Sequence, residues 1–277
     1  MPKALSQAAV EDYRRDGYYF PVPALSESEV GHYRACLERH EATSGQPLQG
    51  NYRHKAHLLF TWVDELVHHP KIVDAAEDIL GPDLLCWTTN FFIKEANSPG
   101  FVSWHQDAFY WGLNKDDVMT AWVALSPASL ESGCMKFLPG SQTQDHIQHI
   151  DTFHKDNLLS RGQEIAVKVD SAKTVDCMLK PGEMSLHHVK VVHGSEPNRS
   201  NDRRIGLAIR YIPTYVKQLK ARDSATLVRG VDRYHHFDLE PRPERDLDAA
   251  AMAAHADAIG RQVKALYSGT DKQEFRA

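Results

Sequence analysis

The chain has 277 residues, of which 42% are hydrophobic and 25% charged, a composition typical of a globular protein large enough to bury a sizeable core. Its formal net charge of −5 argues against a nucleic-acid or anionic-membrane partner. The four cysteines are widely spaced, the N-terminal segment lacks the apolar run of a signal peptide, and no apolar segment approaches membrane-spanning length, so we expect a reduced, cytoplasmic protein.

Helical patterns dominate residues 1–83. Two helices are predicted within residues 6–41, and the second begins with a capping box in which Ser26 is followed three residues later by Glu29. A third helix is predicted over residues 70–80, because a proline opens an apolar stripe there and a Gly-Pro pair ends it. The N-terminal part of the chain is therefore predicted to be mainly helical.

From residue 84 onward the pattern changes to short apolar or alternating runs separated by turns that contain Gly and Pro. Such runs are typical of the strands of an antiparallel sandwich or barrel. They lie at residues 85–94, 118–125, 135–138, 174–179, 184–187, 189–193 and 204–212. We predict a β core over about residues 84–215, then a helical part over about residues 216–277 with an alanine-rich helix at 247–266. The simplest interpretation is a single domain over residues 1–277.

His105 and Asp107 form a His-x-Asp motif on a predicted strand. Side chains two residues apart on a strand emerge on one face, so both can hold the same ion. His193 is the candidate for the third ligand. Two imidazoles and one carboxylate on one face of an octahedral ion leave three positions open, as in non-haem iron oxygenases. A His-x-Asp pair alone is also compatible with a surface or strand-edge pair, so the distal histidine matters.

The segment after His193 is predicted to turn near residue 200 and to return as the second strand of a hairpin. Alternation along this return strand places Arg204 and Arg210 on one face with small residues, and branched apolar residues on the other. We therefore predict that Arg204, with Ser195 nearby, binds a buried carboxylate. Arg210 is predicted to lie nearer the mouth of the site, where it meets an anionic group of the substrate or pairs with a carboxylate at the rim.

Together these features resemble the bacterial branch of the phytanoyl-CoA dioxygenase family. The resemblance covers most of the chain and rests on residues 104–107, 133–141, 181–188 and 193–195 and on Arg204. It implies a mainly β protein with flanking helices and a double-stranded β-helix (jelly-roll) core. It also implies iron(II) as the metal, with 2-oxoglutarate and O2 as co-substrates. Related halogenases replace the metal-binding carboxylate with a small residue, so Asp107 predicts hydroxylation or another oxidation instead of halogenation.

The resemblance also implies which residues hold the co-substrate. The contacts to 2-oxoglutarate would be Trp122, Ser195 and Arg204, together with Asn90 and Lys94, which share strand parity. Lys55 is a further candidate from a looser alignment. Phe109, Tyr110 and Trp111 follow the metal motif and are predicted either to line the substrate site, where aromatic rings can hold a cationic group, or to belong to the core.

The substrate is expected to be a small molecule, and the oligomeric state is left open. Bacterial members of this branch include hydroxylases of small organophosphonates such as 2-aminoethylphosphonate and its trimethylammonium analogue, and an arginine beside an aromatic wall suits that class. The alternatives are a hydroxylase of another small metabolite, such as an amino acid, and a metal- or 2-oxoglutarate-binding module without oxygenase activity. Residues 142–161 are predicted to form a long polar loop, a candidate lid.

Overall fold

The computed structural model describes residues 2–267 and residue 275 of the chain. Its strands are β1 (Tyr18–Pro23), β2 (Leu84–Lys94), β3 (Val102–His105), β4 (Met119–Ala124), β5 (Met135–Phe137), β6 (His149–Asp151), β7 (Gln163–Ile165), β8 (Val175–Cys177), β9 (Glu183–His188), β10 (His193–Ser195), β11 (Arg204–Pro213), β12 (Ser224–Arg229) and β13 (Asp238–Leu239). Its helices are α1 (Gln7–Asp16), α2 (Glu27–Ser44), α3 (Thr61–Val67), α4 (Pro70–Leu80), α5 (Ala108–Trp111) and α6 (Ala249–Leu266). Short 3-10 turns lie at Gly50–Arg53, Ala56–Leu58, Ser141–Thr143 and Ser171–Lys173.

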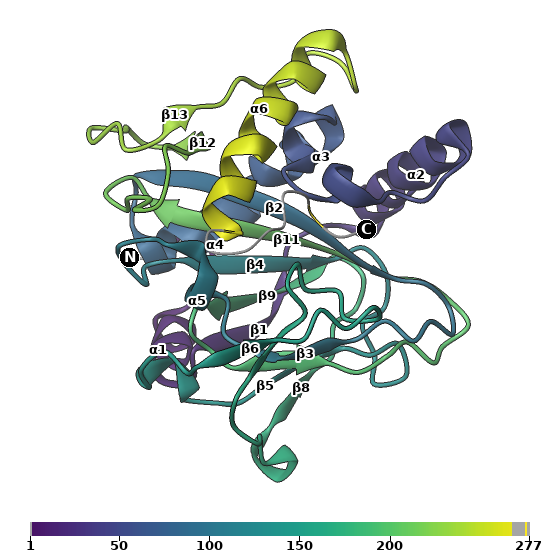
Figure 1. The fold of residues 1–277 in the computed structure, drawn as a ribbon, viewed down its shortest axis with the longest axis vertical. Coiled ribbons are helices and arrows are strands. Elements are labelled where there is room, and N and C mark those ends of the chain that lie inside the picture. The colour runs from purple at the N-terminus through teal and green to yellow at the C-terminus, as the bar shows by residue number, and fades with distance from the viewer. Residues whose placement is uncertain (1, 268–274, 276–277) are drawn as a thin grey trace.

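Two sheets form the centre of the described part of the chain. One has the strand order β1-β9-β4-β11-β2-β12-β13, and the other has the order β3-β10-β5-β8. Trp122 and Ala208 of the first sheet pack against Met135 and Phe137 of the second, so the two sheets face each other. Figure 1 shows α3 and α6 on one side of the larger sheet and the smaller sheet on its other side. Apart from the central sheets, β6 and β7 pair with each other.

Helices α1, α2, α4 and α6 form where local signals predicted helices, whereas α3 and α5 were not predicted. At the start of α2 the Glu29 carboxylate accepts a hydrogen bond from the Ser26 backbone N–H at 2.7 Å, and the Ser26 hydroxyl accepts one from the Glu29 N–H. This helix ends at Gly45, whose φ of +71° suits glycine. Among the described residues no helix is long and apolar enough to cross a membrane.

Strand alternation decides which residues of β11 face the site. Ile205, Leu207 and Ile209 point away from the smaller sheet and join the core formed with α1 to α4. Arg204 and Arg210 lie on the opposite face and line a pocket between the sheets. The predicted parity of this strand is confirmed.

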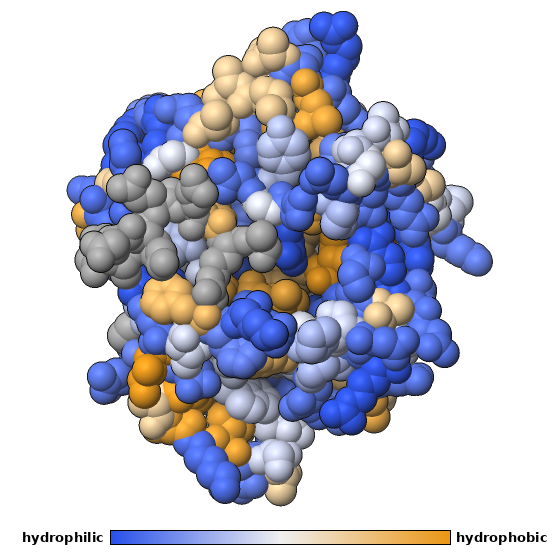
Figure 2. Space-filling model, turned by 45° about the vertical axis from the view of Figure 1, so that its right-hand side comes forward, coloured by the Kyte–Doolittle hydropathy of each residue, from blue (hydrophilic) through white to orange (hydrophobic). Residues whose placement is uncertain are grey.

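Figure 2 shows that hydrophilic side chains cover most of the visible surface, with hydrophobic ones at the base of a central hollow.

The predicted hairpin after His193 is wrong. Strand β10 pairs with β3 and β5 in the smaller sheet, whereas β11 pairs with β2 and β4 in the larger one. The segment between them crosses from one sheet to the other, so the two strands face each other instead of sharing an edge. The strand predicted over residues 189–193 begins only at His193, because residues 189–190 form a turn.

The larger sheet extends beyond the predicted β core. Strand β1 comes from the N-terminal part and pairs with β9, and β12 comes from the part predicted to be helical and pairs with β2. The stretch at residues 142–161 is also not a continuous loop, because β6 lies within it. The division of the chain into a single domain stays a prediction.

Candidate active site

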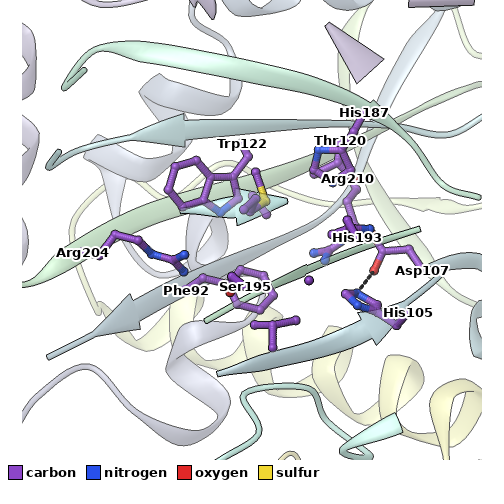
Figure 3. Close-up of a pocket in the computed structure, with 14 residues that line it drawn as sticks. Phe92, His105, Asp107, Thr120, Trp122, His187, His193, Ser195, Arg204 and Arg210 are labelled. Carbon is purple, nitrogen blue, oxygen red and sulfur yellow. Dashed lines mark ion pairs between the residues drawn. The ribbon is translucent and has the colours of Figure 1, made fainter. Parts of the chain in front are cut away.

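His105, Asp107 and His193 lie together in the buried space between the sheets. His105 ends β3 and His193 begins β10, and their Cα atoms are paired in the register of the smaller sheet. One ligand atom from each of the three residues lies within 4.8 Å of the others, and all three side chains are buried. The His105 Nε2 atom is 3.4 Å from Asp107 Oδ1 (Figure 3). Within the described residues, this is the cluster that could hold a metal ion.

Asp107 reaches this position by a route that differs from the predicted one. It lies after the end of β3, in the turn that caps α5, with φ −64° and ψ −37°. The two ligand candidates therefore do not share a face through strand alternation. The turn brings the carboxylate back towards His105.

Both imidazoles are oriented by backbone carbonyl groups. The Nδ1 atom of His105 lies 2.9 Å from the Ser103 carbonyl oxygen, and that of His193 lies 3.0 Å from the Val191 carbonyl oxygen. A carbonyl oxygen only accepts, so each Nδ1 donates, and the lone pair of the neutral ring is on Nε2. Such contacts are typical of metal-binding histidines.

The charges of the cluster also suit a divalent metal. Burial and the neighbouring His105 lower the pKa of His193 to about 3, so this imidazole is neutral at neutral pH. Burial alone would raise the pKa of Asp107, but Arg210 and His105 outweigh it and hold the pKa well below its usual range. Among the described residues, the buried Asp107 Oδ2 atom has no hydrogen-bond partner. A neutral imidazole and an ionised carboxylate are the states that ligate iron(II).

Arg204 lies at the other end of the same pocket (Figure 3), and the buried Lys94 lies next to that end, where it contacts Ser195. Arg204 donates from Nη1 to the Gly133 carbonyl oxygen at 2.6 Å, and its Nε has no partner within the described residues. The Lys94 ammonium donates to Ser195 Oγ at 2.7 Å and also to the carbonyl oxygens of Gly133 and Glu196. The hydrogen bonds of both basic side chains thus go to neutral oxygens, which leaves the Arg204 charge and the Lys94 amine available to an incoming carboxylate.

The Trp122 ring lies against this end of the pocket. The Arg204 guanidinium carbon is 5.2 Å from the centre of the indole, within the range of a cation–π contact. The indole occupies the space that a side chain at position 206 would fill, because a Cβ atom on Gly206 would lie 1.8 Å from the ring. Gly206 therefore permits the stacking of Trp122 and Arg204.

Asn90 and Lys55 lie elsewhere. Asn90 accepts a hydrogen bond from Arg210 Nη1 at 2.7 Å, contacts His54, and lines a second pocket instead of the Arg204 end. Its role at 2-oxoglutarate stays a prediction. Lys55 is fully buried and donates to Glu240 Oε1 at 2.6 Å, so its role is structural.

The second pocket shares Phe92, Asp107 and Arg210 with the first. Tyr110 and Trp111 line it, and Trp111 also belongs to a hydrophobic core cluster, so the role of both rings as a substrate wall stays a prediction. The side chain of Phe109 lies outside the described part of the structure.

The sequence interpretation missed several residues at these pockets. His187 lines the first pocket, and its ring centre is 4.9 Å from that of His193. Its position follows from its pairing with Thr120, which lines the same pocket, and no local pattern in the sequence gives that pairing. Arg161 and His149, from the stretch predicted as a loop, are also part of the site region: His149 Nε2 accepts a hydrogen bond from the Gln106 backbone N–H at 2.9 Å.

Known proteins with similar sequences and structures agree with this geometry. A family model described as phytanoyl-CoA dioxygenase (PhyH) matches residues 13–206. A solved structure of the non-heme monooxygenase ThoJ, in its apo form, is 38% identical and covers 93% of this chain and 97% of that one, with a TM-score of 0.82. The non-heme alpha ketoglutarate dependent carbocyclase SnoK is 26% identical and covers 89% of this chain and 98% of that one, with a TM-score of 0.62. These matches confirm the jelly-roll core; in the described residues the two sheets do not close into a barrel.

Among curated proteins, a probable alpha-ketoglutarate-dependent hypophosphite dioxygenase from Stutzerimonas stutzeri is 32% identical over 159 residues. That match covers 56% of this chain and 54% of the relative. The chain spans about half the length of the curated relatives that it first matches.

Proposed function

The chain belongs to the phytanoyl-CoA dioxygenase family of non-haem iron oxygenases, and we propose that it uses iron(II), O2 and 2-oxoglutarate to hydroxylate a small polar substrate. One observation carries this proposal: a buried cluster of two histidines and one carboxylate shares a pocket with the buried Arg204, and neither Arg204 nor the adjacent Lys94 has an acidic hydrogen-bond partner among the described residues. A site for metal alone would not need the two basic side chains.

His105, Asp107 and His193 would hold the iron in this proposal. Bound iron and 2-oxoglutarate together supply the activation of O2 for oxidation of a substrate C–H bond. The backbone contacts of the two imidazoles keep Nε2 directed at the metal position, and burial of the cluster excludes bulk water.

Arg204, Lys94 and Ser195 would bind the carboxylate of 2-oxoglutarate that is remote from the metal. A guanidinium, an ammonium and a hydroxyl together offer charge-assisted hydrogen bonds to both carboxylate oxygens. Trp122 supports the guanidinium from its ring face. Since the two basic side chains already lie at this end of the pocket, little rearrangement is needed on binding.

We further propose a small organophosphonate, such as 2-aminoethylphosphonate or its trimethylammonium analogue, as the substrate. The buried Arg210 supports this class, because it lies beside Asp107 on the side away from Arg204 and could meet an anionic group. The similarity to a hypophosphite dioxygenase also favours a phosphorus-containing anion.

The proposal is tested by aerobic incubation with iron(II) and 2-oxoglutarate, with O2 uptake and succinate formation as readouts. We expect turnover by the unmodified protein, stimulated by the correct substrate. His105→Ala and Asp107→Ala should each lose at least about 100-fold of this turnover, because loss of a ligand costs more than loss of a group that only orients one, which is about 10- to 100-fold. His235→Ala serves as a control, because this histidine side chain is 77% exposed and remote from the cluster. Binding of 2-oxoglutarate without succinate formation would instead identify a binding module.

A further inference from the structure

The second pocket carries a charge pattern that bears on the substrate. Two buried arginines, Arg161 and Arg210, line it. Among its described lining residues, Asp107 is the only carboxylate, and its charge faces the proposed metal position. Each arginine is matched by one carboxylate, Arg161 by Asp151 and Arg210 by Asp107, so a divalent metal would leave this region with a net positive charge.

Both arginines already occupy the aromatic wall of this pocket. The Arg161 guanidinium carbon lies 4.0 Å from the centre of the Tyr110 ring, and that of Arg210 lies 4.9 Å from the Trp111 ring. These are cation–π distances. A cationic group of a substrate brought to either ring would meet the like charge of an arginine. The aromatic wall thus serves the protein's own cations.

Arg210 keeps donor capacity for a ligand. Its Nη1 donates to Asn90 Oδ1 at 2.7 Å, whereas its buried Nε has no hydrogen-bond partner among the described residues. Arg161 is held more tightly: its Nε and Nη2 atoms donate to Asp151, and its Nη1 donates to the Leu266 carbonyl oxygen at 3.2 Å. Arg161, paired with Asp151, thus contributes a guanidinium held in place over the Tyr110 ring, whereas Arg210 keeps an unbonded Nε donor that lies 3.9 Å from Asp107 Oδ2.

The far wall of the pocket adds no charge. The ring of His54 stacks on Phe275, with centres 3.8 Å apart and planes inclined by 12°. Burial and the neighbouring Arg53 and Arg210 hold the pKa of His54 well below its usual value, so this histidine is neutral. The wall formed by His54 and Phe275 therefore offers neither a counter-ion for an ammonium group nor a cation of its own.

We propose that the second pocket is a subsite for a small oxoanion, such as a phosphonate, phosphinate or carboxylate, and that it discriminates against substrates with an ammonium or trimethylammonium group. This proposal rests on the proposed function and narrows it. Both organophosphonates named above carry a cationic group, so the arrangement of Arg161 and Arg210 favours a phosphonate without such a group over either of them. Like-charge contacts of this kind are an ordinary source of specificity at protein sites.

The first test compares three ligands of the same skeleton. Ethylphosphonate, 2-aminoethylphosphonate and 2-(trimethylammonio)ethylphosphonate are titrated calorimetrically into protein loaded with Mn²⁺ and saturated with 2-oxoglutarate, so that the Arg204 end is already filled. We expect ethylphosphonate to bind at least about tenfold more tightly than either cationic ligand, since tenfold corresponds to one unfavourable charge contact of about 1.4 kcal/mol. Equal or tighter binding of a cationic ligand would overturn the proposal.

The second test asks whether Arg161 supplies the selectivity. Arg161→Met should weaken ethylphosphonate binding and reduce the difference between the three ligands, while Arg161→Lys should retain part of both. Arg222→Met is the matched control, because Arg222 also pairs with an aspartate, Asp238, but is exposed. Thermal melting of each variant reports whether the fold persists. Unchanged selectivity in a folded Arg161→Met protein would contradict the assignment.

These binding measurements separate the two proposals. If ethylphosphonate binds selectively but no succinate forms with iron(II), the oxygenase function fails and the oxoanion subsite stands. If succinate formation is stimulated by an uncharged or cationic substrate and ethylphosphonate does not bind, the oxygenase function stands and the subsite is refuted.

Discussion

The Arg210 Nε atom lies 3.9 Å from Asp107 Oδ2, and within the described residues neither of these buried atoms has a hydrogen-bond partner. The guanidinium is held from its other side by Asn90 and by the Trp111 ring. Arg210 is thus placed to orient the carboxylate proposed as a metal ligand. Loss of a group that orients a metal ligand typically costs about 10- to 100-fold in metal affinity or activity.

Arg210→Met should therefore weaken metal binding by about 10- to 100-fold. Arg210→Lys should give an intermediate loss, because an ammonium retains the charge but not the planar fork of donors. The measurement is the dissociation constant for Mn²⁺ by titration calorimetry, with Arg222→Met as control. If Arg210→Met changes phosphonate affinity but not metal affinity, Arg210 serves the substrate alone.

Lys94 is expected to gain a proton when 2-oxoglutarate binds. Burial and the neighbouring Arg204 lower the pKa of Lys94 to about 6, so near neutral pH this amine is mostly uncharged in the free protein. An incoming carboxylate favours the charged form and raises the pKa, so binding takes up a proton at about pH 7.5 and less at about pH 5.5, where Lys94 is already protonated.

Proton uptake is measured by calorimetry of 2-oxoglutarate binding in buffers with different ionisation enthalpies. Lys94→Met should abolish the uptake and weaken 2-oxoglutarate binding. Uptake that persists in this variant would assign the proton to another group.

The low pKa of Lys94 also affects the stability of the fold. Between about pH 6 and the usual lysine pKa, Lys94 is protonated in the unfolded chain but not in the folded protein, so this group makes the free energy of unfolding rise with pH.

Gly206→Ala should displace Trp122 and weaken 2-oxoglutarate binding. The new Cβ atom would lie 1.8 Å from the indole, so the ring must leave its position against Arg204. The expected cost in stability is about 1–3 kcal/mol, typical of overpacking. Gly31→Ala is the matched control: nothing lies within 4 Å of its added methyl group, and it is in the exposed middle of α2. That control should be neutral or stabilising, by up to about 1 kcal/mol. The readouts are thermal melting and the KM for 2-oxoglutarate.

Lys55→Met should destabilise the fold without changing the KM for 2-oxoglutarate. Glu240 would lose its buried partner, and breaking a buried pair costs about 3–5 kcal/mol. The double variant Lys55→Met with Glu240→Leu should recover much of this loss.

The same pair makes stability depend on pH. Burial would raise the pKa of Glu240, but Lys55 and His57 outweigh burial and hold this pKa below its usual value. The pair therefore stabilises the fold at neutral pH, and this contribution is lost in acid. A raised KM in a fully folded Lys55→Met protein would return Lys55 to the co-substrate site.

Short-range patterns in the sequence were enough to predict many structural features of this protein. The capping box at Ser26 and Glu29 and the helix at residues 70–80 depend on contacts within a few residues, so neighbouring residues alone predict them. The parity of β11 is also local, because successive side chains of any strand point to opposite faces. That parity correctly placed Arg204 and Arg210 on the pocket side even though the predicted hairpin was wrong.

The pairing of distant segments was decided only by the tertiary structure. The sequence alone could not show that β10 and β11 lie in facing sheets, that a turn returns Asp107 towards His105, or that Lys55 pairs with Glu240, 185 positions away. Such contacts depend on which apolar faces pack together across the whole core, and no local pattern encodes that choice. Residue types and spacing therefore predicted the metal cluster, whereas packing of the two sheets placed Arg210 beside Asp107 and Arg161 at the second pocket.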